Sequence, residues 1–433
     1  MKISIIGTGY VGLVSGVGFA SKGHDVICVD IVEEKVEMIN RGEPPIYEEG
    51  LDELLKDVVS DDRLSATTDT EKAVKETDLT FICVGTPSRT DGGVDISGVE
   101  KAVEDMIQPL KVKDEYHVFC VKSTVVPGTT EEKVLPILER SDKVVGEDFG
   151  LGMNPEFLRE GIALEDFLNP DRIVLGGWDE KTLDFLSKAY DEFEAPKLET
   201  DIKTAEMIKY TSNALLATKI SFANEISRIC ESIGIDVYGV MDGVGMDHRI
   251  NRDFLNAGAG FGGSCFPKDV KALVRFAEDS DLEANLLNSV LSINEEQPVH
   301  IINRLEKISG GLEDKKVAFL GLAFKGGTDD VRETRALPMV EKLLELDSDV
   351  IGYDPEATDN FKELLSGRIQ YADDVAEALQ NADICIIQSD WDEFKELTAQ
   401  DFKPMKGKVI VDARRLLDPA DLTDDFIYIG VGL

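Results

Sequence analysis

The sequence has few basic residues, few histidines and no long apolar run. It holds 46 lysines and arginines against 85 aspartates and glutamates, a net charge of -39, and a surface of that sign repels the phosphates of nucleic acids. No apolar stretch approaches the roughly 18 residues that cross a bilayer. The opening MKISIIGTGY runs from a strand-like segment into glycines, unlike a signal peptide. We therefore expect no nucleic-acid partner and no membrane partner.

The six cysteines and four histidines have no metal-ligand or disulfide spacing. The absence of any CxxC pair fits a reduced cytoplasm, which is the location we predict. Cys28, Cys83, Cys120 and Cys385 lie inside strand-like apolar runs, where a thiol is an inert core residue. We predict no metal site, and no Ser-His-Asp order suggests a hydrolase. Cys265, in a glycine-rich segment, is the thiol that needs another explanation.

The acidic residues are spread along the chain rather than gathered in one tail. This distribution predicts an acidic shell over a folded protein rather than a disordered segment. We interpret it as an adaptation to a salt-rich, halophilic cytoplasm, where counterions screen the self-repulsion at short range. An acidic protein from an ordinary cell is the alternative.

Short apolar strands alternate with amphipathic helical stretches at both ends of the chain. The expected strands are KISIIGTG, DVICVD, LTFICVGTP and HVFCVKST near the start, and KKVAFLGLAF, SDVIGYDP, ADICIIQSDW and GKVIVDARR near the end. This alternation predicts parallel sheets with helices on both faces. Between them, residues 201–233 contain no Pro or Gly and predict one long helix, a candidate spine and dimer surface. The predicted fold is α/β, with two Rossmann-like doubly wound domains joined by this helix.

The segment GTGYVG, from Gly7 to Gly12, fits the G-x-G-x-x-G fingerprint of dinucleotide-binding proteins. It follows a strand and opens a helix, so Gly7 permits the turn, Gly9 admits the pyrophosphate and Gly12 lets the helix pack on the strand. Asp30 ends the next strand, where a carboxylate binds the ribose hydroxyls and repels a 2′-phosphate. Since no arginine follows Asp30, we predict NAD rather than NADP.

The decapeptide GFGGSCFPKD places Cys265 among small residues just before Pro267, a residue typical of the first turn of a helix. A helix N-terminus and the nearby Lys268 both lower the pKa of a thiol. In an NAD enzyme, such a thiolate adds to an aldehyde and gives a thiohemiacetal, whose hydride leaves to form a thioester. The pattern therefore indicates oxidation past the aldehyde, and a glycine turn with an incidental thiol is the alternative.

This loop resembles the catalytic loop of the UDP-glucose/GDP-mannose dehydrogenase family. Further blocks agree in order along essentially the whole chain: GTGYVG with Asp30, GTP at Gly85 to Pro87, KSTVVPGT, NPEFLREG, EMIKYTSNA, RINRDFLNAGAGFGGSCFPKD and AFKGGTDDVRET. Family members oxidise the C6 alcohol of a nucleotide sugar to a carboxylate with two NAD+. The resemblance implies an NAD-binding domain over 1–200, a central helical dimerisation and catalytic region over 201–300, and a UDP-binding domain over 301–433.

The resemblance also implies roles for single residues. Cys265 matches the nucleophile, and Lys209 and Asn213, one helical turn apart, match a pair that stabilises charge on one oxygen. Asp269 matches the carboxylate that helps to activate water, Glu156 matches a general base, and Thr124 matches the residue that positions a water. The matching NAD contacts are Val11, Asp30, Lys35, Thr86, Thr124, Glu160, Lys268 and Arg332. The matching substrate contacts are Glu156, Phe157, Leu158, Arg159, Glu160, Lys209, Asn213, Phe254, Leu255, Asn256, Ala257, Gly258, Gly262 and Lys325.

Arg249 matches an arginine that reaches the sugar from a neighbouring subunit, so we expect a functional homodimer or higher oligomer. In the C-terminal domain, Arg414 and Arg415 are either phosphate ligands or a solvated pair. The sequence of the cysteine loop resembles UDP-glucose enzymes most, which favours UDP-glucose as substrate over GDP-mannose or a UDP-N-acetylhexosamine. A single-step alcohol dehydrogenase and a non-catalytic NAD-binding scaffold are the alternatives from other classes; the first yields one NADH per sugar and the second none.

Overall fold

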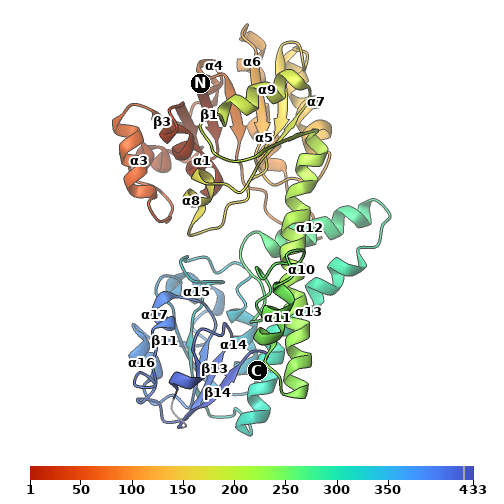
Figure 1. Ribbon diagram of the computed structural model, residues 1–433. Helices are drawn as coiled ribbons and strands as arrows, with labels where there is room; N and C mark the ends of the chain where they lie inside the picture. Colours follow the sequence, from red (N-terminus) through yellow and green to blue (C-terminus); the bar gives the residue numbers. More distant parts are fainter. Residues whose placement is uncertain (423–424) are drawn as a thin grey trace. The chain divides into compact units, whose positions relative to one another are not determined.

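The computed structural model describes residues 1–422 and 425–433 (Figure 1). The chain folds into two compact units, Met1–Ser212 and Asn213–Leu433, here called unit 1 and unit 2. Among the described residues, no helix combines the length and apolar character needed to span a membrane.

Unit 1 is built on one eight-stranded sheet. Neighbouring strands are parallel except for the antiparallel pair β6–β7, where Gly152 lies opposite Gly177. The order reverses between β1 and β4, which makes their carboxyl ends the switch point of the sheet. In spatial order the strands are β3 (Leu64–Thr67), β2 (Asp25–Val29), β1 (Lys2–Ile6), β4 (Leu79–Ile82), β5 (His117–Val121), β6 (Phe149–Met153), β7 (Ile173–Gly177) and β8 (Lys197–Thr200).

Helices cover both faces of this sheet. Alternate residues of one strand serve opposite faces: Val118 belongs to one apolar core and Phe119 to the other. The first core is shared with α1 (Tyr10–Ser21), α3 (Leu51–Ser60), α8 (Ala163–Leu168) and α9 (Glu180–Ala189). The second is shared with α4 (Thr70–Glu76), α5 (Ser97–Glu104), α6 (Ile107–Val112) and α7 (Leu135–Leu138). The remaining elements of unit 1 are α2 (Glu33–Asn40), the π-helical turn η1 (Thr130–Val134) and the 3-10 turn η2 (Glu139–Ser141).

The described part of unit 2 holds a six-stranded parallel sheet that reverses order between β9 and β12. The strands in spatial order are β11 (Gln370–Tyr371), β10 (Asp349–Tyr353), β9 (Lys316–Leu320), β12 (Ile384–Ile387), β13 (Val409–Asp412) and β14 (Ile427–Gly430). The accompanying helices are α11 (Val237–Gly245), α12 (Phe266–Asp279), α13 (Asn285–Ser309), α14 (Ala336–Glu345), α15 (Thr358–Leu365), α16 (Val375–Leu379), α17 (Asp392–Lys395) and the 3-10 turn η3 (Pro419–Asp421).

A single 32-residue helix, α10 (Ile202–Ile233), carries the chain from unit 1 into unit 2. Asp201 caps its first turn: one carboxylate oxygen accepts from the Thr204 backbone N–H at 2.8 Å and the other from the Thr204 hydroxyl at 2.6 Å. The prediction of one long helix is confirmed.

The predicted fold class is confirmed as well. Each of the eight expected strand segments forms a strand, and in both units these strands lie side by side at the centre of the sheet. The strands that were not predicted lie toward the sheet edges; β3, β8 and β11 are short and partly exposed, whereas β6 and β7 are buried five-residue strands that contain glycine. The division into 1–200, 201–300 and 301–433 stays a prediction.

Candidate active site

The glycine fingerprint forms an open loop at the carboxyl end of β1. Gly7 has a φ of +96°, and a Cβ there would lie 2.9 Å from the Cys83 carbonyl oxygen. A Cβ on Gly12 would lie 1.8 Å from the Gly7 carbonyl oxygen, so only glycine lets α1 start this close to the loop. Around Gly9, in contrast, no atom lies within 4 Å of the Cβ position. The loop is tight on its inner side and open at Gly9, which fits the approach of a pyrophosphate to the N-terminus of α1.

Asp30 stands at the end of β2, half-buried beside this loop. One carboxylate oxygen accepts from the Thr8 N–H at 3.0 Å and the Thr8 hydroxyl at 2.6 Å, and the other accepts from Val32 N–H at 3.0 Å. Burial works to raise the pKa of Asp30, but these hydrogen bonds and the charge of Lys35 outweigh it and lower the pKa. The residue is thus an ionised acceptor near the glycine loop, as ribose binding requires.

Two threonines predicted to contact NAD lie together at the ends of neighbouring strands. The Thr86 hydroxyl, in the loop after β4, donates to the Thr124 carbonyl oxygen after β5 at 2.9 Å. Parallel strands place both loops at the same edge of the sheet as Gly7. Val11 lies in the first turn of α1 and Lys35 lies in α2, so unit 1 carries most of the predicted NAD contacts at this edge.

Glu156 and Lys209 form a buried ion pair in unit 1. Their oxygen and nitrogen atoms are 2.8 Å apart, and their side chains are only 6% and 3% exposed. The second Glu156 oxygen accepts from the Leu158 N–H at 2.6 Å. Burial raises the pKa of Glu156, but Lys209, this N–H and nearby Lys122 prevail and lower it. Glu156 is therefore held as a carboxylate, able to accept a proton but a weak base while Lys209 stays bound.

The segment after Glu156 spreads its side chains over different partners. Phe157 lies under the Arg172 guanidinium, 3.9 Å from the ring centre, and the Lys209 ammonium is 5.6 Å from the same ring. The exposed Arg159 forms a two-point ion pair with Asp166. The guanidinium of Arg159 is therefore bound to Asp166 at the protein surface.

Lys122 is a buried lysine that directly follows β5. It was not predicted as a site residue from the sequence. Its ammonium donates to the Asn154 side-chain oxygen at 2.8 Å, and the Tyr190 hydroxyl donates to the same oxygen at 2.5 Å. Burial lowers the pKa of Lys122. The sequence did offer a signal for it: in the segment KST, a lysine directly follows an apolar strand, where it is expected near the carboxyl edge of the sheet.

Cys265 is the N-cap residue of α12, and Pro267 lies in the first turn. The predicted helix start is confirmed. The thiol is half-buried, with Sγ 3.4 Å from the Ser264 hydroxyl. Cys28 and Cys83, in contrast, are buried core thiols, and burial raises the pKa of both to about 12. Cys265 is thus an accessible thiol at a helix N-terminus, as the sequence predicts.

Asp269 is buried one turn into α12 and is held from two sides. Its oxygens accept from the Lys268 ammonium at 2.7 Å and from the Asn213 side-chain amide at 2.6 Å. Lys268, which was predicted to contact NAD, is thus ion-paired with Asp269. The amide of Asn213 is hydrogen-bonded to the other oxygen of the same carboxylate. Three predicted residues, Lys268, Asp269 and Asn213, therefore form one hydrogen-bonded chain in unit 2, beginning three residues after Cys265.

Three buried amide side chains fix the backbone before Cys265. Asn294 of α13 accepts from the Phe261 N–H at 2.7 Å and donates to the Phe261 carbonyl at 3.0 Å. Asn224 of α10 accepts from the Gly258 N–H at 2.8 Å, and Gln297 donates to the Gly258 carbonyl at 3.0 Å. Sequence reasoning missed all three, because a polar residue in a helix usually marks a solvated face.

The predicted substrate segment packs beside this loop. Phe254 has a φ of 63°, a conformation that is strained for a bulky residue and often found at functional sites. Its ring lies 6.2 Å from that of Phe266, the residue after Cys265. Leu255 and Ala257 are buried, while Asn256 is exposed and accepts from Arg252. A Cβ on Gly258 would lie 2.8 Å from the Ala413 carbonyl oxygen, and one on Gly262 would lie 2.4 Å from that of Glu333.

The switch point of the unit 2 sheet, at the carboxyl ends of β9 and β12, is built differently from that of unit 1. Asp354 ends β10 as Asp30 ends β2, but it is buried and accepts from the N–H groups of Leu322 and Ala323 at 2.7 and 3.0 Å. It has no exposed oxygen comparable with Asp30, which is consistent with a different ligand. Lys325 lies in the loop after β9, and Arg332, on the same connection, is bound to Asp330.

Arg414 and Arg415 are not a solvated pair, because both are partly buried and bound within the protein. A role as phosphate ligands stays a prediction. Arg414 donates to the carbonyls of Gln388 and Phe324, both at 2.7 Å, and so joins the loops that follow β12 and β9. Arg415 forms a two-point ion pair with Asp236. Arg249, by contrast, is 77% exposed and bound to its near neighbour Asp247, on the surface of its own chain.

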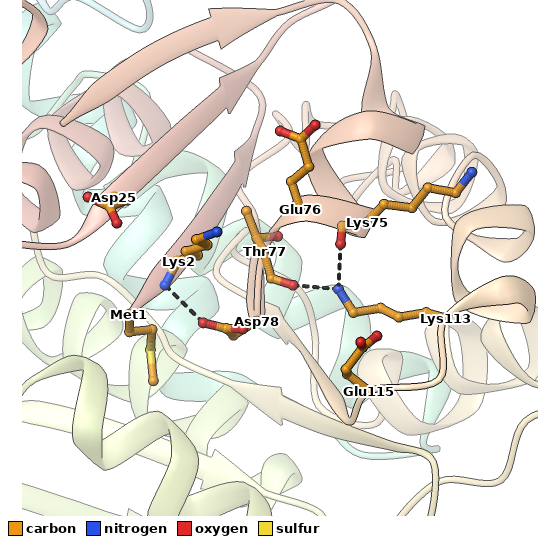
Figure 2. Close-up of a pocket in the computed structure, with 9 residues that line it drawn as sticks. All are labelled: Met1, Lys2, Asp25, Lys75, Glu76, Thr77, Asp78, Lys113 and Glu115. Carbon is orange, nitrogen blue, oxygen red and sulfur yellow. Dashed lines mark hydrogen bonds between the residues drawn. The ribbon is translucent and has the colours of Figure 1, made fainter. Parts of the chain in front are cut away.

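A hollow of about 470 Å³ lies at the opposite edge of the unit 1 sheet (Figure 2). It is lined where strands begin, for example by Lys2 and Asp25, and not where they end. Within it, the Lys113 ammonium donates to the carbonyls of Lys75 and Thr77 (Figure 2). It also donates to the Val74 carbonyl and thereby caps α4. This hollow therefore lies away from the edge of the sheet that carries the glycine loop.

A doubly wound sheet with an open glycine loop, together with a thiol at a helix N-terminus, defines a dinucleotide-dependent dehydrogenase. Comparisons with known proteins specify which kind. The UDP-glucose/GDP-mannose dehydrogenase family matches by its NAD binding domain over residues 1–194, its central domain over 203–296 and its UDP binding domain over 318–419. The chain belongs to this family, and the match of the NAD binding domain confirms the predicted cofactor.

Relatives match over their full lengths. UDP-glucose 6-dehydrogenase AglM of Haloferax volcanii is 44% identical over 96% of this chain and 97% of its own. UDP-glucose 6-dehydrogenase TuaD of Bacillus subtilis is 42% identical over 100% of this chain and 93% of its own. Among solved structures, a UDP-glucose dehydrogenase from Pyrobaculum islandicum has a TM-score of 0.92 at 42% identity, covering 100% of this chain and 97% of its own.

Proposed function

We propose that this enzyme oxidises the C6 hydroxyl of UDP-glucose to a carboxylate, forming UDP-glucuronate with two NAD+ and one water. The observation that carries the proposal is full-length identity above 40% to proteins named for this reaction, in a chain with Cys265 at a helix N-terminus. Bound NAD+ supplies the hydride acceptor for each of the two oxidations. The loop at Gly9 and the carboxylate of Asp30 would hold it.

The first oxidation takes a hydride and a proton from the C6 alcohol. Lys209 stabilises the negative charge that develops on the sugar oxygen, and Glu156 is the proposed proton acceptor. The buried pair of Glu156 and Lys209 supports these roles, because a carboxylate and an ammonium kept apart from water interact strongly with a reacting group. When the Lys209 ammonium binds the substrate oxygen instead of Glu156, it no longer lowers the pKa of Glu156, which becomes a stronger base.

The second oxidation needs a covalent bond to the protein. The Cys265 sulfur adds to C6 of the aldehyde, and the thiohemiacetal loses the C6 hydrogen as hydride to become a thioester. Water then attacks the thioester, Asp269 helps to orient it, and Cys265 leaves as the thiolate. The contacts of Asp269 with Lys268 and Asn213 support this role because they keep the carboxylate in one orientation.

A homodimer is the assembly we propose, with α10 as part of its surface. Leu215, Phe222 and Ile229 are spaced seven residues apart on this helix and are 60%, 47% and 53% exposed. A repeat of seven places them in one apolar stripe, as in helices that pack against a partner. The exposed Arg249 would then be available to a neighbouring chain. We propose a cytoplasmic location on the cysteine usage alone.

The experiment is a nucleotide-sugar panel with NADH formation followed at 340 nm. UDP-glucose is expected to be turned over strongly. A specific alternative is UDP-N-acetylmannosamine, because a UDP-D-ManNAc dehydrogenase from Pyrococcus horikoshii has a TM-score of 0.87 at 30% identity, covering 100% of this chain and 99% of its own. Turnover of that sugar or of GDP-mannose, with none of UDP-glucose, would refute our choice.

A further inference from the structure

Glu206 is a buried carboxylate of α10 that the proposed reaction does not use. Its side chain lies in unit 1 and is completely inaccessible to water. One oxygen accepts from the Gly128 N–H at 2.6 Å and the other from the Thr130 N–H at 2.9 Å. A buried acid that binds two backbone donors of a distant loop is a tether between that loop and the helix.

The tethered loop is the one that carries Thr124. It runs from the end of β5 to η1, and the hydrogen bond from Thr86 to the Thr124 carbonyl at 2.9 Å holds its first half. Glu206 holds its far end. Glu206 also lies one helical turn before Lys209. It therefore fixes this loop, here called the Thr124 loop, against the helix that carries the proposed catalytic lysine.

The two protonation states of Glu206 are not equivalent in this tether. A carboxylate offers one acceptor oxygen to each N–H, whereas a carboxylic acid turns one of those oxygens into a donor that faces an N–H. Burial raises the pKa of Glu206 to about 7; the Thr130 and Gly128 groups oppose this shift, and the charge of Glu131 adds to it. The other charges nearby are Lys203, which binds Glu131 and Glu132, and Lys209, which is paired with Glu156.

We propose that Glu206 is a positioning residue that holds the Thr124 loop for NAD+ when ionised and releases one end of it when protonated. The enzyme then binds NAD+ more weakly as the pH falls through neutrality. The proposal rests on the proposed contacts of Thr124 and Thr86 with NAD+.

The test is NAD+ affinity, measured by fluorescence titration of the full-length protein from about pH 6 to about pH 8.5 around the shifted pKa. Wild type is expected to lose roughly threefold to tenfold in affinity toward the acid end, the size of one hydrogen bond. Glu206→Gln, which has one acceptor oxygen at every pH, should bind as weakly at pH 8.5 as wild type does at pH 6, with no dependence on pH. An unchanged pH dependence in Glu206→Gln would overturn the proposal.

Two further variants keep the test decisive if Glu206→Gln folds poorly. Glu131→Gln removes the charge that raises the pKa of Glu206, so the midpoint of the affinity change should move to lower pH. Glu132→Gln, an exposed neighbour on the same turn, should leave the midpoint in place. Identical midpoints in wild type, Glu131→Gln and Glu132→Gln would contradict the proposal. NADH formation from UDP-glucose by wild type at pH 8.5 tests the proposed function separately.

Discussion

Replacing Lys209 by Met tests both the buried ion pair and the proposed chemistry. The substitution keeps most of the side-chain volume but leaves the Glu156 carboxylate buried without its 2.8 Å partner. Breaking a buried pair in this way typically costs about 3–5 kcal/mol. The remaining contacts with the Leu158 N–H and with Lys122 place the expected loss near the lower end, at about 3 kcal/mol. For a unit of this size, that corresponds to a melting temperature lower by about 6–12 °C.

The assay follows the unfolding of unit 1 by tryptophan fluorescence. The chain has two tryptophans, Trp178 in unit 1 and Trp391 in unit 2, so a Trp391→Phe background reports unit 1 alone. The matched control is Lys203→Met, on the same helix but bound only to partly exposed acids, for which a loss below about 1 kcal/mol is expected. The double variant Glu156→Gln/Lys209→Met removes the orphaned charge and should recover most of the stability.

The pH dependence has a definite sign. In wild type the pKa of Glu156 is lowered, so the pair stabilises the fold above the unfolded pKa and this contribution is lost as the pH falls through the folded pKa. In Lys209→Met burial raises the pKa of Glu156 instead, so the penalty grows as the pH rises from about 4.5. Turnover should fall by about a hundredfold to a thousandfold in both the single and the double variant. If Lys209→Met were no less stable than Lys203→Met, or the double variant recovered nothing, the ion-pair argument would be refuted.

Other predictions address the cofactor, the assembly and the surface charge. Asp30→Asn should weaken NAD+ binding by about tenfold to a hundredfold in a titration, because a charge-assisted acceptor is lost; equal affinity would remove Asp30 from the site. Phe222→Asp should shift a dimer toward monomer in sedimentation, because it places a charge in the apolar stripe; an unchanged mass would exclude this face. Melting temperature should rise across a KCl series, since salt screens the net charge of -39; a flat series would exclude the halophilic interpretation.

The fold was predictable from the sequence because its central strands are buried on both sides. Segments such as VAFL and ICII are apolar throughout, and their glycine or aspartate boundaries mark the ends. Strand β8, KLET, was not predictable: it is an edge strand with exposed residues and no apolar pattern. The hydrophobic pattern of a segment reflects which of its residues are buried. A strand such as β8, with few buried residues, therefore has no pattern by which it could be predicted.

The candidate site was predictable where a residue has few structural uses. A glycine series after a strand and a thiol before a helix proline both have a limited set of explanations, and the structure gives each the expected surroundings. The supporting residues were not predictable. Asn294, Lys122 and Arg414 act through partners distant in sequence, so only the folded chain reveals the groups they bind. Whether the predicted residues contact NAD+ and the sugar as proposed stays a prediction.

The number of NADH molecules formed per UDP-glucose, in wild type and in Cys265→Ala, tests the central claim most directly. Wild type should form two and release UDP-glucuronate. Cys265→Ala should still bind both ligands and reduce added UDP-gluco-hexodialdose with NADH, but it should form no acid and only slight NADH, because the second hydride leaves from a thiol adduct. Steady formation of two NADH per sugar by Cys265→Ala, or of only one by wild type, would contradict the account.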